Sequence, residues 1–71
     1  MTTVDERIVA RRRAVEEADR IYAETGYQQQ VLHIAMQGGA DRFTVCPADE
    51  HRIPLNQGEY LLGFVYRSGG Q

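Results

Sequence analysis

The sequence predicts an α+β fold in which one long N-terminal helix packs on a three-stranded antiparallel sheet, in the order α-β-β-β. Two observations predict it. Apolar residues recur at helical spacing over residues 4–24, whereas the chain after Gly26 alternates apolar and polar residues as strands do. At 71 residues the chain is one small domain. We expect this domain to span residues 1–67 and a flexible tail to follow at 68–71.

The predicted helix has a signal at each end. Thr3 and Glu6 have the spacing of a capping box, and Gly26 suits the left-handed conformation that ends many helices. Between these signals, apolar residues form one stripe along the helix. The stripe contains Val4, Ile8, Val15, Ala18 and Tyr22, widened by Ala14 and Ile21.

Arginines interrupt this stripe near its N-terminal end. Arg11 lies within the stripe and Arg7 at its edge, and neither has an acidic residue four positions later. The opposite side carries pairs at that spacing, each worth about 0.2–0.5 kcal/mol. These pairs are Arg12–Glu16, Arg13–Glu17, Glu16–Arg20 and Arg20–Glu24. Arg7 and Arg11 are therefore available to a partner, unless the stem of Arg11 lies along the apolar stripe and its head reaches water.

Three strands are predicted, over residues 29–37, 42–46 and 59–67. Gly38-Gly39 indicates a hairpin, which makes the first two strands neighbours and leaves the third at an edge. In the first strand, alternation separates two faces: Leu32, Ile34 and Met36 on one, and Val31, His33 and Ala35 on the other. In the second strand, Phe43 and Val45 face the core, and Arg42, Thr44 and Cys46 face away. The order of the strands stays open.

The third strand is apolar on both faces, which is typical of strands covered on both sides. Alternation places Tyr60, Leu62, Phe64 and Tyr66 on one face and Leu61 and Val65 on the other. Two interpretations follow. The connection over 47–58 covers the second face with Ile53 and Leu55, or that face is a second patch for a partner or a homodimer. The residues of this candidate patch are Leu61, Phe64 and Val65.

Composition restricts the class of protein. The net charge is −2, so nucleic-acid binding would need a local basic patch. The single Cys46 allows no internal disulfide, which favours a reducing, cytoplasmic location. No apolar run approaches the length of a membrane span, and the polar N-terminus is unlike a signal peptide. We expect a cytoplasmic protein with no membrane partner.

Few residues indicate catalysis or metal binding. Cys46 with His33 or His51 would supply a nucleophile and a base, but no orienting group or oxyanion hole is indicated. Cys46, Asp49, Glu50 and His51 lack the paired spacing of zinc ligands. The prediction is a protein without catalytic residues, metal or cofactor.

The C-terminal Gly69-Gly70-Gln71 is similar to the terminus of the prokaryotic ubiquitin-like proteins, which would imply deamidation of Gln71 and its ligation to lysines. The resemblance covers these three residues. The rest of the chain departs from that family, whose members are acidic and largely disordered. The same triplet occurs in peptide-chain release factors, inside a loop of a much larger domain. We assign the chain to neither family.

The function we expect is that of a small non-enzymatic interaction protein. Its N-terminal helical turns would bind a larger protein or nucleoprotein machine, because arginine and apolar side chains together suit an interface. The predicted contact residues are Val4, Arg7, Ile8, Arg11 and Arg12. A phage or mobile-element regulator of RNA polymerase is the type we expect. The alternatives are an inhibitor of a nucleic-acid-handling defence complex of the anti-CRISPR type, a small nucleic-acid-binding module, and a structural homodimer.

Overall fold

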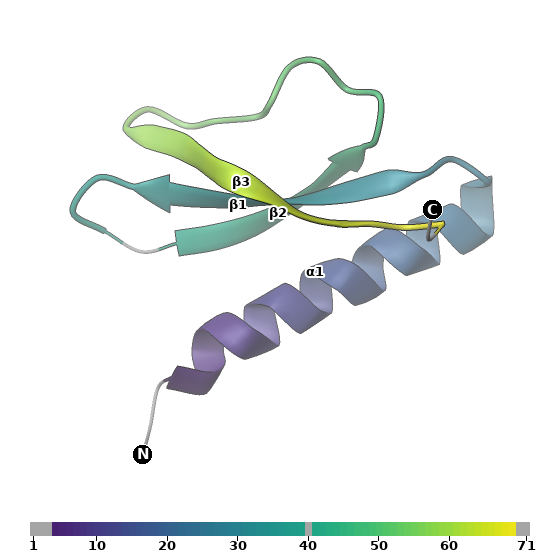
Figure 1. Ribbon diagram of the computed structural model, residues 1–71, viewed down its shortest axis with the longest axis horizontal. Helices are drawn as coiled ribbons and strands as arrows, with labels where there is room; N and C mark the ends of the chain where they lie inside the picture. The colour runs from purple at the N-terminus through teal and green to yellow at the C-terminus, as the bar shows by residue number, and fades with distance from the viewer. Residues whose placement is uncertain (1–3, 40, 70–71) are drawn as a thin grey trace.

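A computed structural model describes residues 4–39 and 41–69, with side chains from Glu6 onward, and shows one helix on one side of a three-stranded sheet (Figure 1). The elements are helix α1 (Val4–Thr25) and strands β1 (Gln29–Met36), β2 (Asp41–Pro47) and β3 (Glu59–Arg67). This confirms the predicted α-β-β-β fold. Thr3 of the expected capping box and Gly70-Gln71 of the expected tail lie outside the described residues.

The central strand of the sheet is β1, since the strand order is β2-β1-β3 and both pairings are antiparallel. The β1–β2 hairpin forms at the predicted glycines. Gly38 has a φ of +72°, a value that favours glycine, and the Gly39 N–H donates to the Met36 carbonyl at 2.9 Å. The third strand is at an edge, as predicted, and it pairs with β1.

The main core lies between α1 and the sheet. Ala14, Ala18 and Val31 are buried at its centre, with relative exposures of 9%, 0% and 0%. Alanine lets the helix approach the strands closely, because no larger side chain separates the backbones. The half-buried residues packed around this centre are Val15, Phe43, Val45, Val65 and Tyr66. The predicted inward direction of Phe43 and Val45 is confirmed.

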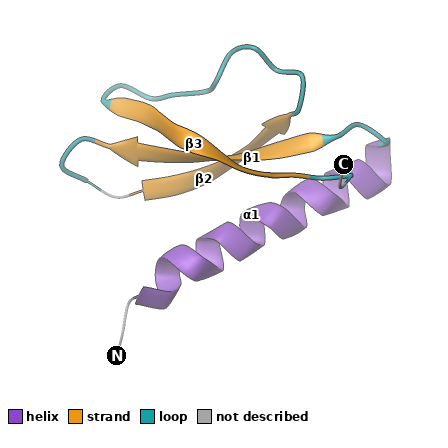
Figure 2. Cartoon of the chain, in the orientation of Figure 1, coloured by secondary structure: helices purple, strands orange, loops and turns teal. Residues whose placement is uncertain are grey.

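The far face of the sheet is also buried at its centre. Leu32, Ile34 and Cys46 are 5%, 0% and 6% exposed, and the connection over 48–58 lies on that side of the sheet (Figure 2). The Arg42 side chain fastens this connection, because its Nη2 donates to the Pro54 carbonyl at 2.9 Å and its Nε donates to Glu59 at 2.7 Å. The domain thus has three layers: connection, sheet and helix.

The predicted alternation of β3 is wrong. Its pairing with β1 shifts twice, between Val31 and Leu32 and between His33 and Ile34. Each shift inserts one extra residue into β3, Val65 in the first case and Leu62 in the second, and an inserted residue interrupts the alternation of faces. As a result Leu61 and Phe64 share the far face, opposite Ile34 and Leu32.

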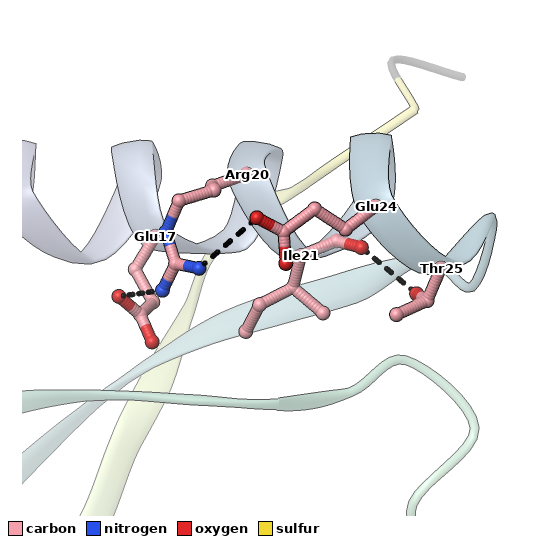
Figure 3. Close-up of polar contacts among 5 residues, drawn as sticks. All are labelled: Glu17, Arg20, Ile21, Glu24 and Thr25. Atoms are coloured by element: carbon pink, nitrogen blue, oxygen red, sulfur yellow. Dashed lines mark hydrogen bonds and ion pairs between the residues drawn. The ribbon is translucent and has the colours of Figure 1, made fainter.

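The helix ends as its sequence predicts. It stops at Thr25, Gly26 follows with a φ of +80°, and the Gly26 N–H donates to the Tyr22 carbonyl at 2.8 Å. The Thr25 hydroxyl also donates to the Ile21 carbonyl at 2.8 Å (Figure 3).

The surface ion pairs of α1 differ from those predicted. Arg20 contacts Glu24 at 3.5 Å, as expected, and also Glu17 at 2.9 Å (Figure 3). Within the described part of the chain, the other predicted pairs of Arg12, Arg13 and Arg20 are not formed. Glu17 is already bound by Arg20, and exposed pairs of this kind gain too little free energy to fix long side chains.

Candidate partner-binding surface

The first turns of α1 diverge from the sheet. Figure 1 shows the helix crossing beneath the strands at an angle, so the distance between them widens toward the N-terminus. Burial changes in the same way along the helix: Ala14 and Ala18 are buried, whereas Ile8 is 53% exposed. The first turns of α1 therefore lie away from the sheet, which leaves Ile8 largely in contact with solvent.

Arg7 contacts the sheet despite this separation. Its Nε lies 3.4 Å from Asp41 Oδ2, at the start of β2. The same carboxylate oxygen lies 2.9 Å from His33 Nε2, and the His33 ring stacks on Phe43 with centroids 4.7 Å apart. Arg7 therefore has an acidic partner within the monomer, which the spacing along the helix did not reveal. Its side chain is nevertheless 69% exposed and remains accessible.

Arg11 and Arg12 are exposed beside Ile8. Neither forms an ion pair with any carboxylate of the described residues. The helical period places Ile8, Arg11 and Arg12 on one side of α1. We call these three residues the helix patch. Val4, also predicted to belong to this surface, has no described side chain.

Arg13 is exposed as well, but the helical period places it on the opposite side of α1 from Arg11. It too has no ion pair among the residues that the structure describes. Arg13 therefore has the charge and exposure of Arg11 without its position, which makes it a suitable control for experiments on the helix patch.

The residues predicted as a second patch are only partly together. Leu61 and Phe64 lie on the far face of β3 and are 39% and 59% exposed. Val65, in contrast, packs against the core between α1 and the sheet. Leu62, which the prediction left out, is 50% exposed. The shifts of register at Leu62 and Val65 explain the difference, and Gly63, a glycine inside a strand, is a signal that could have indicated such a shift.

The residues considered for chemistry do not form a site. Cys46 is buried and its sulfur accepts a hydrogen bond from Gln30 Nε2 at 3.5 Å, whereas His51 is exposed in the connection. His33 is bound to Asp41. Across residues 4–39 and 41–69, no group of three or more His, Cys, Asp or Glu side chains is placed to hold a metal ion.

The ion pair between Arg42 and Glu59 has a structural role. Glu59 receives two hydrogen bonds from Arg42, at 2.7 and 2.9 Å, and one from the Asn56 backbone at 2.7 Å. The hydrogen bond from Arg42, followed by the one from Asn56, lowers the pKa of Glu59 to about 2. The pair fastens the connection between β2 and β3 to the sheet.

The fold and these surfaces define a small α+β domain with exposed apolar and cationic groups. No helix in the described residues is long and apolar enough to cross a membrane. Comparison with protein-family models, with curated proteins and with solved structures found no match to this chain.

Proposed function

We propose that this protein is a non-enzymatic interaction protein that binds a larger protein through the helix patch, with Arg7 at its border. The observation that carries the proposal is the exposure of Ile8 beside two arginines that have no ion-pair partner in the described structure. An interface buries an apolar side chain of this kind and surrounds it with arginines that bind acidic groups.

The chemistry of the helix patch favours an acidic protein surface as the partner. Arginine binds carboxylates with paired hydrogen bonds, and Ile8 supplies apolar area at the centre. Nucleic acid is a weaker fit, because Glu16, Glu17 and Asp19 follow on the same helix and the net charge of the chain is −2. The partner we propose is a large machine of the cytoplasm, such as RNA polymerase, which a phage or mobile-element regulator would modulate.

The test is affinity capture from lysate of the source cells, with the partner identified by mass spectrometry and its binding then measured with purified components. We expect Ile8→Glu and Arg11→Glu each to weaken binding at least tenfold. Arg13→Glu makes the same change of charge on the other side of α1 and should retain binding within about twofold. Far-UV circular dichroism and thermal unfolding should be the same for all three variants, because the three side chains are exposed.

Two outcomes would contradict the proposal. If Arg13→Glu weakens binding as much as Arg11→Glu does, the interaction depends on total charge, as expected of a nucleic-acid binder. If Ile8→Glu unfolds the protein, Ile8 belongs to the core.

A further inference from the structure

The outer edge of β3 is apolar and uncovered. This strand occupies one end of the sheet, and α1 packs mainly against β1 and β2. Between Glu59 and Arg67 the strand has no charged residue and no proline. Edge strands of stable monomers usually carry charges, prolines or β-bulges that oppose pairing with other chains, and of these β3 has only the extra residues at Leu62 and Val65. Four exposed apolar side chains lie along β3, with relative exposures from 39% to 59%: Tyr60, Leu61, Leu62 and Phe64.

We propose that β3 pairs with β3 of a second copy of this chain, antiparallel and about a two-fold axis near Leu62 and Gly63. The two sheets would then join into one sheet of six strands, with both helices on the same side. This inference concerns a different surface from the helix patch and does not depend on the proposed function.

The residues on the two faces of β3 support pairing with itself. Leu61 and Phe64 share the far face, where they continue the buried layer of Ile34 and Leu32 outward to the edge. A two-fold axis between them places Leu61 of one copy opposite Phe64 of the other, and the reverse. These contacts bury two large apolar side chains from each copy, Leu61 and Phe64, which is the self-complementarity that a two-fold interface requires.

The charges at the ends of β3 select the direction of pairing. The strand begins with Glu59, which Arg42 already binds, and ends with the exposed Arg67. The Glu59 side chain is 5% exposed and stays bound to Arg42, so the charge that matters is that of Arg67, and antiparallel pairing keeps the two Arg67 side chains at opposite ends of the interface. Parallel pairing would instead place the two Arg67 side chains together, and like charges on adjacent strands are unfavourable.

The length of β3 allows pairing along the whole strand. The nine residues of β3 extend for about 30 Å at the usual rise of a strand.

The test is the mass of the full chain in solution by sedimentation velocity over a range of concentrations. We expect twice the 8.1 kDa of one chain at high concentration. Phe64→Asp should reduce the mass to that of one chain while leaving the circular dichroism of the fold intact. Tyr27→Asp is the matched control, because Tyr27 is 74% exposed and lies outside the strands; it should leave the dimer unchanged. A wild-type chain that sediments as a monomer at every concentration would overturn the proposal.

A second variant tests the geometry even if Phe64→Asp fails to fold. A Cβ on Gly63 would meet no atom within 4 Å, so Gly63→Cys fits the strand. In a Cys46→Ser background, mild oxidation should then link two copies through residue 63, because this position lies beside the two-fold axis. Tyr27→Cys in the same background should not form this link. Equal cross-linking of the two variants would show that collisions, rather than paired strands, join the copies.

Discussion

The hydroxyl of Tyr66 donates a hydrogen bond to Asp19 Oδ1 at 2.7 Å, which joins the end of β3 to the middle of α1. Because α1 packs mainly against β1 and β2, this hydrogen bond adds a direct side-chain contact between the helix and the edge strand. The hydrogen bond to the Asp19 carboxylate raises the pKa of Tyr66, since the carboxylate favours the protonated phenol.

Tyr66→Phe should lower the free energy of unfolding at neutral pH by about 0.5–1 kcal/mol, which is less than a buried bond to a charged group contributes, because this bond is exposed to solvent. A raised pKa in the folded state means that this stabilisation is complete below the usual tyrosine pKa, about 10. It is lost as the pH rises through the folded value. Urea unfolding at neutral and at strongly alkaline pH measures the difference. Tyr60→Phe is the control, and an equal loss in both variants would assign the effect to a different cause.

Glu59 should make the free energy of unfolding depend on pH under acidic conditions. Its pKa falls from 4.5 to about 2 on folding, so its contribution is complete above 4.5 and is lost as the pH falls toward 2. Glu59→Gln should therefore be less stable at neutral pH and should show a flatter decline in stability across this window. Urea unfolding at several pH values measures both effects. Glu16→Gln should keep the wild-type slope, because Glu16 has no ion pair among the described residues. Equal slopes for all three proteins would contradict the prediction.

Ala18 should not accept a larger side chain. It is fully buried on the side of α1 that faces the sheet. Ala18→Leu must therefore displace the helix or adopt a strained rotamer, at a cost of about 1–3 kcal/mol. Ala23→Leu places the same side chain on the exposed side of the same helix and should change stability by less than about 0.5 kcal/mol. Thermal unfolding compares the two variants. Similar melting temperatures would show that α1 does not pack closely on the sheet.

Ser68 belongs to the packed domain, although it begins the segment expected to be flexible. It is fully buried, its Oγ accepts from the Gln29 N–H at 2.8 Å, and its own N–H donates to the Gln29 carbonyl at 2.9 Å. Ser68→Ala would leave the buried Gln29 N–H without an acceptor and should lower the free energy of unfolding by about 1–3 kcal/mol. Hydrogen exchange at the Gln29 amide provides a local measurement. Unchanged stability together with unchanged exchange would show that the hydroxyl has no structural role.

The sequence was sufficient for features that depend on neighbouring residues. Gly26 ends α1 and Gly38-Gly39 turns β1 into β2, because the conformations at these positions favour glycine whatever surrounds them. The exposure of Ile8 and Arg11 depends in addition on the angle between α1 and the sheet. The 22 residues of α1 and the nine residues of β3 have similar lengths, about 30 Å, so a helix parallel to the strands would have been covered.

The tertiary structure decided the features that depend on residues far apart in the chain. Asp41 binds Arg7 across more than thirty positions of sequence, and no spacing rule relates them. The faces of Leu61 and Phe64 follow from extra residues in β3, which only the pairing with β1 defines. Local backbone preferences depend on short stretches of sequence, whereas strand register and contacts between elements depend on how the whole chain packs.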